Sequence, residues 1–260
     1  MKKIFTLLAV AAMALTASAQ TWYIPYTMVQ DPANPDKEIA ETDFVIADGV
    51  TVAEDTDCPM TFGNDGAWKN DKRDQFKPAD DPAYANYKRY AVGNGNPKCD
   101  GSGYKNDANT AMPTTGTYYT FAPKADGSLS VACKPGSGKL IRIVTSEGTF
   151  APFTGVESES GTALAANTSV TNGLVGTNTY SILKFDVKSN VKYALLVDGS
   201  KLSLWGYYFT ADGSSAITDI TVDENAPVEY FNLQGIRVDN PENGLYIKRQ
   251  GNNVTKVLVK

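Results

Sequence analysis

The sequence predicts an all-β protein built as an antiparallel β-sandwich, followed by a small C-terminal β-rich tail. Two runs carry this prediction, residues 116–134 and residues 184–210. In both, apolar and polar side chains alternate with the period of two that buries one face of a strand and leaves the other in water. A third observation agrees with these two. Apolar residues do not recur at helical spacing over three turns anywhere in the chain.

The run at residues 116–134 predicts two strands joined by a tight turn as a β-hairpin. Pro123 ends the first strand because it cannot donate a ladder hydrogen bond, and Asp126-Gly127 supplies positive-φ turn residues. The alternating apolar residues are Tyr119 and Phe121 in the first strand and Leu129, Val131 and Cys133 in the second.

Residues 1–19 predict an export signal. Lys2 and Lys3 precede an apolar stretch, residues 4–15, and the small residues Ala17-Ser18-Ala19 form a cleavage site before Gln20. The apolar stretch is too short to span a bilayer and no later one is longer, so we expect no transmembrane segment. We expect a secreted or cell-surface protein.

The rest of the chain divides into a sandwich domain, residues 20–212, and a tail, residues 216–260, with a Gly-Ser break between them. A hairpin is predicted within residues 38–53, around Asp48-Gly49. Further strands are predicted at residues 139–145, 183–187, 193–197 and 201–210, and a turn at Gly251-Asn252-Asn253 predicts a hairpin in the tail. Residues 58–113 form a long irregular segment rich in aromatic, acidic and glycine residues.

Composition excludes several classes of function. The chain has no histidine, which removes Ser-His-Asp and Cys-His catalysis and imidazole metal ligands. Three cysteines are too few for a four-thiolate zinc site. The net charge of −5 gives no field that would hold phosphate backbones, so we expect no nucleic-acid partner.

The three cysteines differ in their surroundings. Cys133 alternates in phase with Leu129 and Val131, so we place it in the core as a small apolar residue. Cys58 and Cys99 lie in loop-like sequence and are our candidate disulfide pair, since an exported protein permits disulfides. Spacing alone does not determine which cysteines pair.

Four stretches together show a resemblance. They are FGNDGAWK (62–69), GNGNPK (93–98), PTTGTYYTFAPKADGSLSV (113–131) and KFDVKSNVKYALLVDGSKLSLWGYYF (184–209). As a set they resemble a β-sandwich module of secreted Bacteroidetes proteins that often lies beside pectate-lyase-type and other glycan-degrading domains. The resemblance covers residues 40–210. It implies a jelly-roll-like fold akin to carbohydrate-binding modules, most of which in this group have no assigned activity.

The tail, residues 216–260, resembles the C-terminal sorting domain that the type IX secretion system of Bacteroidetes recognises. The matching residues are Leu233, Gly235, Val238, Gly244, Tyr246 and Ile247, with the basic ending. The tail is shorter than that family and lacks its usual Pro-Asn-Pro strand start. The resemblance implies secretion machinery as a partner and delivery to the cell surface.

Aromatic residues of the long segment are candidate ligand-binding residues. Trp68 is the first, and Tyr84, Tyr87 and Tyr90 have the spacing of one side of a short helix. Aromatic rings with polar neighbours suit the apolar faces of sugars. The alternative is that these rings fill the open end of the sandwich, because burial is the usual fate of large aromatics.

Residues 202–209 are apolar on both faces of the predicted strand. Alternation places Leu202, Leu204 and Tyr208 on one face and Trp205, Tyr207 and Phe209 on the other. Either both faces are buried or Trp205 belongs to an aromatic platform that binds a ligand.

Acidic and amide side chains in the loops are candidate ligands for a structural calcium ion. The candidates are Asp55, Asp57, Asn94, Asn96 and Asp100. Calcium takes six to eight oxygen ligands from such loops, but no spacing matches an EF-hand. Solvated loop acids are the alternative. Basic residues at 69–89 are interleaved with aspartates, which indicates a solvated loop rather than a polyanion site.

We therefore expect a non-enzymatic protein that binds polysaccharide or another glycan through loop aromatics. A structural or adhesive protein that contacts other proteins is the alternative. A polysaccharide lyase or glycosidase is a third hypothesis, because paired carboxylates can act without histidine, but no pair stands out. Gly136-Ser137-Gly138-Lys139 is not a P-loop, since Cys133 and Leu140 replace required residues.

Overall fold

The computed structural model describes residues 20–77, 84–159, 164–212, 227–232, 235–250 and 253–259. The chain separates into two compact units, Met1–Ser214 and Ser215–Lys260. The described residues contain no α-helix, and all strand pairings between them are antiparallel, which confirms the all-β prediction. The predicted export signal lies outside the described residues. The described part of the chain has no helix long and apolar enough to cross a membrane.

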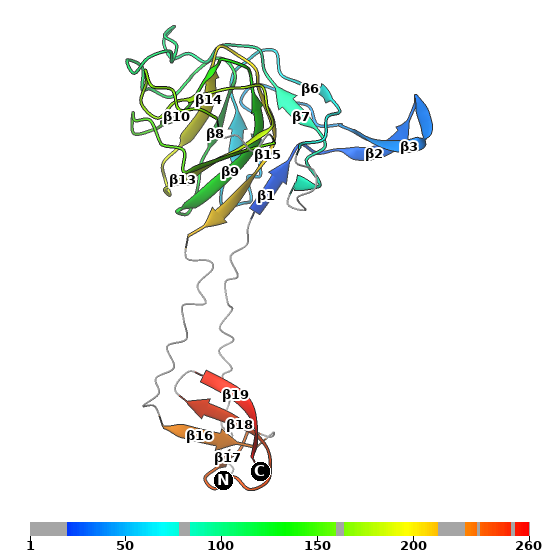
Figure 1. Ribbon diagram of the computed structural model, residues 1–260, viewed down its shortest axis with the longest axis vertical. Helices are drawn as coiled ribbons and strands as arrows, with labels where there is room; N and C mark the ends of the chain where they lie inside the picture. The colour runs from blue at the N-terminus through cyan, green and yellow to red at the C-terminus, as the bar shows by residue number, and fades with distance from the viewer. Residues whose placement is uncertain are drawn as a thin grey trace, which may run out of the picture. The chain divides into compact units, whose positions relative to one another are not determined.

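Two large sheets form the sandwich of the larger unit (Figure 1). The seven-stranded sheet has the order β11 (Gly155–Ser158), β13 (Ser181–Val187), β9 (Gly127–Pro135), β15 (Leu202–Ala211), β7 (Tyr90–Val92) and β6 (Lys69–Lys72), and β1 (Gln20–Tyr23) also pairs with β15. The six-stranded sheet has the order β12 (Leu174–Val175), β10 (Leu140–Thr145), β14 (Tyr193–Asp198), β8 (Tyr118–Phe121), β5 (Met60–Phe62) and β4 (Thr51–Val52). A separate hairpin pairs β2 (Thr27–Asp31) with β3 (Asn34–Glu41).

The predicted strands at residues 116–134 exist as β8 and β9, but the predicted hairpin is wrong. β8 pairs with β14 and β5, whereas β9 pairs with β13 and β15 in the other sheet. The chain therefore crosses from one sheet to the other at Pro123–Asp126. The crossing at Asp198-Gly199 does the same between β14 and β15. The hairpin predicted within residues 38–53 is also wrong, since β3 pairs with β2 and β4 pairs with β5.

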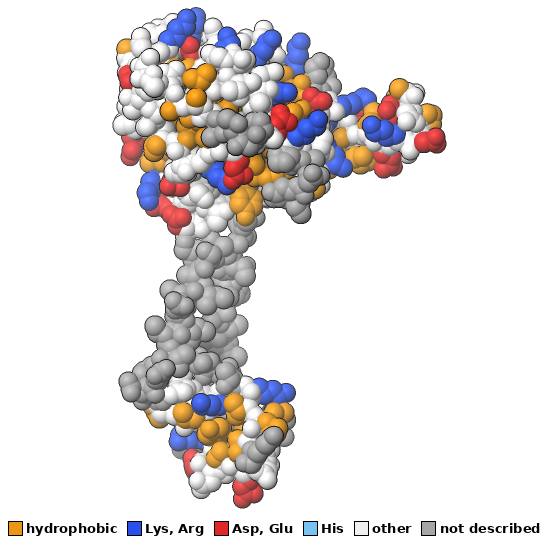
Figure 2. Space-filling view, viewed as in Figure 1, with side chains coloured by type: hydrophobic (Ala, Val, Ile, Leu, Met, Phe, Trp, Pro, Cys, Tyr) orange, Lys and Arg blue, Asp and Glu red, His pale blue; other side chains and the backbone are white. Residues whose placement is uncertain are grey.

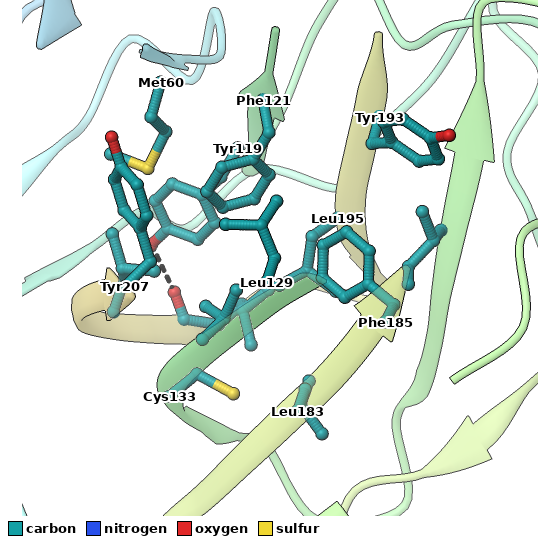
Figure 3. Close-up of a cluster of buried hydrophobic side chains, with 14 of the residues drawn as sticks. Met60, Tyr119, Phe121, Leu129, Cys133, Leu183, Phe185, Tyr193, Leu195 and Tyr207 are labelled. Carbon is teal, nitrogen blue, oxygen red and sulfur yellow. Dashed lines mark hydrogen bonds between the residues drawn. The ribbon is translucent and has the colours of Figure 1, made fainter. Parts of the chain in front are cut away.

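The main core lies between these two sheets (Figure 3). Phe121 and Leu195 reach it from the six-stranded sheet, and Leu129, Phe185 and Tyr207 reach it from the seven-stranded sheet. Cys133 is buried there as predicted. Because consecutive strands lie in opposite sheets, the alternating residues of both strands point into the same core.

Two buried tyrosine hydroxyls tie this core to loop and strand carbonyls. The Tyr119 hydroxyl donates a hydrogen bond to the Leu202 carbonyl at 2.6 Å, which joins the two sheets. The Tyr207 hydroxyl donates to the Cys58 carbonyl, also at 2.6 Å. A buried polar group without a partner costs free energy, so each bond fixes the position of the backbone that accepts it.

A β-bulge at Trp205 changes the predicted faces of β15. Leu204 lies opposite Cys133 and Gly206 opposite Ala132, so Trp205 is an extra residue in the ladder. The extra residue shifts the alternation by one, and Tyr207 and Phe209 join the main core with Leu202 and Leu204. Our assignment of Trp205 to the same face as Tyr207 and Phe209 is therefore wrong, as is that of Tyr208 to the same face as Leu202 and Leu204.

Trp205 points to the outer face of the seven-stranded sheet, where a second apolar cluster covers it. Phe76, Tyr84 and Tyr87 come from the long segment, and Tyr180, Ile182 and Ala132 complete the cluster. A third cluster, formed by Tyr104, Tyr118, Val144, Ala194 and Leu196, lies on the six-stranded sheet. The long segment thus covers both outer faces, because β10, β14 and β15 are apolar on both sides.

The smaller unit is a single four-stranded sheet. Its order is β17 (Arg237–Val238), β16 (Val228–Phe231), β18 (Gly244–Gln250) and β19 (Asn253–Val259), and the predicted β18–β19 hairpin is confirmed. Ile236 and Leu258 are each 63% exposed. Figure 2 shows hydrophobic side chains at the surface of this unit.

We predict that Tyr207→Phe lowers the free energy of unfolding by about 1 to 2 kcal/mol, because it leaves the buried Cys58 carbonyl without its donor. Chemical denaturation of the full chain measures the change. Tyr208→Phe is the matched control, since Tyr208 is the next residue on β15 and lies outside the core cluster. Equal stability of the two variants would contradict the role assigned to the Tyr207 hydroxyl.

Candidate functional site

A groove of about 550 Å³ lies on the outer face of the seven-stranded sheet. Four neighbouring strands contribute to it: Lys134 on β9, Ser203 and Trp205 on β15, Tyr90 and Val92 on β7, and Lys69 on β6. The groove therefore runs across the strands rather than along one of them. Loop residues Ala67, Asp74, Gly93, Asn94, Gly136, Asn178 and Lys201 complete its lining.

Two aromatic rings form the apolar part of the groove. The ring centroids of Tyr90 and Trp205 are 4.7 Å apart, with 40° between the ring planes. Trp205 is only 1% exposed, and its indole N–H donates to the Asp74 carbonyl at 2.6 Å. Tyr90 is partly exposed. The buried Trp205 ring thus packs against the Tyr90 ring, and Tyr90 provides the aromatic surface that is accessible from the groove.

The rim of the groove is polar and mostly basic. Lys69, Lys134 and Lys201 line it together with Asp74. The Lys134 ammonium lies 4.4 Å from the centroid of the Tyr180 ring, a cation–π contact that holds this side chain in place. Asn94 and Asn178 add amide groups that both donate and accept hydrogen bonds.

The turn that carries Lys201 is strained. Gly199, Ser200 and Lys201 have φ angles of 115°, 79° and 69°, all in the left-handed region. A side chain with a Cβ atom costs on the order of 1 kcal/mol there. The Lys201 carbonyl accepts a hydrogen bond from the Gly136 N–H at 3.1 Å, which secures the turn against the end of β9. Such strain commonly accompanies functional sites, because it is kept only where a geometry is needed.

The structure separates the five predicted ligand-binding residues. Tyr90 and Trp205 line the groove, whereas Tyr84 and Tyr87 are 8% and 1% exposed in the cluster that covers Trp205. Burial raises the pKa of Tyr87 far above its ordinary value. Tyr84 and Tyr87 therefore support the sheet face beside the groove.

Trp68 belongs to the edge of the main core. Its ring packs edge-on against Phe62 at 5.2 Å and lies 5.5 Å from Tyr119. The indole N–H donates to the Gly63 carbonyl at 2.9 Å. Its neighbours Ala67 and Lys69 line the groove but Trp68 does not, because successive side chains of an extended chain point to opposite sides.

The predicted calcium ligands are not brought together. Asp57 lies at one end of β8, where its carbonyl accepts from the Lys124 N–H and its side chain from Gln20. Asn94 and Asn96 lie at the other end, beside Asp65 and Gly116. Asp100 has a φ of 49° next to the partly buried Cys99, and Asp55 is two residues from Asp57. Within the described ranges, no group of three or more His, Cys, Asp or Glu residues could hold a metal ion.

The predicted disulfide between Cys58 and Cys99 is not formed, and all three cysteines are free thiols. Cys58 is buried, and its carbonyl accepts a hydrogen bond from the Tyr207 hydroxyl. It lies near the C-terminal end of β8, because the next residue, Pro59, accepts a hydrogen bond from the Ala122 N–H. Cys99 follows Lys98, which pairs with Thr115 before the start of β8. β8, Tyr118–Phe121, lies between these two places, and its four extended residues alone span about 10 Å. A disulfide requires Cα atoms within about 7 Å.

Sequence reasoning missed the lysines and Asp74 as residues of one site. The alternation of their strands indicates that Lys134 and Ser203 face outward, because each lies next to a core residue in the sequence. Lys69 was assigned to a solvated loop. Nothing in the linear order indicates that residues 69, 134 and 201 meet, because their proximity depends on the pairing of β9, β15, β7 and β6.

Comparison with known proteins gives no further assignment. The chain matches no protein-family model, and no curated protein matches it.

We predict that a thiol reagent labels Cys99 in the native protein and labels all three cysteines only after unfolding without a reductant. Burial raises the pKa of the Cys58 thiol to about 12 and that of Cys133 further. Partial burial and the neighbouring Asp100 raise the pKa of Cys99 as well, so its labelling should speed up as the pH rises. Mass spectrometry counts the labels. A single label on the unfolded, unreduced protein would show a disulfide.

Proposed function

We propose that the larger unit binds a glycan in the groove across β9, β15, β7 and β6, and that the protein acts by binding rather than by catalysis. The observation that carries this proposal is the Tyr90–Trp205 pair in a groove with a lysine, asparagine and serine rim. An aromatic face packs against the apolar C–H face of a sugar ring, while rim groups bond its hydroxyls. The resemblance of residues 40–210 to a secreted β-sandwich module akin to carbohydrate-binding modules supports the same function.

The size and charge of the groove agree with binding. Its volume of about 550 Å³ lies within the range of about 300 to 1,000 Å³ typical of ligand sites. Glycoside hydrolysis commonly uses two facing carboxylates. The described residues that line the groove include one carboxylate, that of Asp74, and therefore no facing pair. This composition favours recognition of a sugar over hydrolysis.

We predict that the full chain binds members of a polysaccharide and oligosaccharide array, and that Tyr90→Ala weakens the binding at least about tenfold, or about 1.4 kcal/mol. The reason is loss of the accessible stacking ring. Tyr26→Ala is the matched control, because Tyr26 is also partly exposed but lies outside the groove lining. Trp68→Phe keeps a ring in the core and should leave the affinity unchanged.

Affinity measurements on the best array member, after a circular dichroism check of folding, decide the matter. Equal weakening by Tyr90→Ala and Tyr26→Ala would argue against a site at Tyr90. If the folded protein binds no member of the array, the proposed glycan-binding function is wrong.

A structural or adhesive function, in which the protein contacts other proteins, is the second candidate. The exposed Ile236 and Leu258 of the small unit favour it, because burial of exposed apolar side chains against a partner protein stabilises the complex. It becomes the better candidate if the folded protein binds no glycan.

We also propose that the chain is exported to the cell surface or beyond, with the tail serving secretion or attachment. The charged and apolar pattern of residues 1–19, with its small-residue cleavage site before Gln20, supports export. The N-terminal sequence of the protein isolated from its source should therefore start at Gln20. A protein that retains Met1 would contradict the proposal.

A further inference from the structure

We propose that the groove selects a glycan that carries carboxylate groups, a uronic-acid polysaccharide laid across four strands of the sheet. This inference rests on the proposed glycan-binding function and adds the charge class of the ligand. It follows from the arrangement of the three lysines around the Tyr90–Trp205 pair.

The pairing of the strands places four groove residues in one row. Lys134 lies opposite Ser203, and Lys69 lies opposite Val92. Leu204 lies opposite Ala91, so the antiparallel register continues from Ser203 to Val92. The row therefore runs from Lys134 through Ser203 and Val92 to Lys69. All four residues line the groove.

This row sets the distance between its two charged ends. Neighbouring strands lie about 4.8 Å apart, so the three steps from β9 to β6 separate the backbones of Lys134 and Lys69 by about 14 Å. Lys201 adds a second positive charge near the Lys134 end, since its carbonyl bonds to Gly136 just beyond β9. Backbones this far apart leave room for successive charged sugars of a polymer to contact the two ends while one of its rings lies on Tyr90.

Among its described residues the groove carries more positive than negative charge, with three lysines and one aspartate in its lining. None of Lys69, Lys134 and Lys201 forms an ion pair within the described part of the chain, although other lysines do, such as Lys184 with Glu157 and Lys188 with Asp126. Asp74 is the acid that faces these three lysines from the lining. The whole chain carries a net charge of −5, so a basic groove on it is a local departure. Uncompensated ammonium groups beside an aromatic ring favour an anionic sugar over a neutral one.

The side chain of one lysine and the backbone of a second are held in position before any ligand binds. Lys134 contacts the Tyr180 ring at 4.4 Å, and the left-handed turn at Gly199–Lys201 fixes the backbone of Lys201. A positioned charge loses less conformational entropy on binding than a free one. This arrangement is expected of a site that reads charge and is unnecessary for a solvated lysine.

The test compares polyuronates with their own uncharged derivatives. Polygalacturonate, alginate and hyaluronan are each measured against the same polymer with its carboxyl groups methyl-esterified, in the presence of a chelator so that calcium cannot crosslink the chains. We expect the full chain to bind at least one acid polymer at least about tenfold more tightly than its ester. The affinity should fall as salt is raised, because exposed ion pairs are screened.

Lysine variants locate the effect. Lys134→Gln, Lys201→Gln and Lys69→Gln should each weaken binding of the acid polymer about fivefold and leave binding of the ester unchanged. Lys192→Gln is the matched control, because it removes an exposed lysine outside the groove and should change neither affinity.

Three outcomes would overturn the inference in distinguishable ways. Equal binding of acid and ester, still dependent on Tyr90, would overturn the carboxylate preference and leave the glycan function standing. Equal loss in the Lys192→Gln control would show a general charge effect and overturn the assignment to the groove. No binding of any charged or neutral glycan by the folded protein would overturn both proposals.

Discussion

The β-bulge at Trp205 is the constraint on which the arrangement of the seven-stranded sheet depends. The extra residue turns Tyr207 and Phe209 into the main core and leaves Trp205 on the outer face. The Trp205 carbonyl also accepts from the Ile24 N–H at 3.0 Å, where the chain leaves β1. An indole of this size cannot stay in water without cost, so the outer face needs a cover. The aromatic cluster and the supported Tyr90 ring both follow from this position.

The long segment between β5 and β8 serves as that cover on both sheets. On one side Phe76, Tyr84 and Tyr87 pack over Trp205. On the other, buried Arg142 of β10 pairs with Asp107 and donates to the Asn106 carbonyl at 2.8 Å, which fastens the segment to the six-stranded sheet. Burial lowers the pKa of Arg142 from its ordinary value, and Asp107 opposes this effect. The segment is therefore part of the fold rather than a free loop, and the groove lies beside its covering aromatic residues.

The groove beside this cover has features that packing does not explain. Packing explains why Trp205 is buried and why Tyr90 lies on it, but packing alone does not require three lysines at the rim without an ion pair among the described residues, or a strained turn at Ser200 and Lys201. Strain and uncompensated charge both oppose stability. Their concentration around one accessible aromatic ring is the physical reason why we propose ligand recognition at this face.

The sequence by itself determined that the chain is all-β, where β9, β10, β13 and β14 run, and that Cys133 is buried, because a period of two reports which side of a strand avoids water. It did not determine which strands pair. The crossing at Pro123–Asp126 was therefore predicted as a hairpin, and the crossing at Asp198-Gly199 has the sequence of a hairpin turn as well. Only tertiary structure decided that Trp205 faces outward, because one inserted residue reverses the phase. Only tertiary structure placed Lys69, Tyr90, Lys134 and Lys201 in one groove and kept Cys58 from Cys99, since these distances follow from strand pairing between residues far apart in the chain.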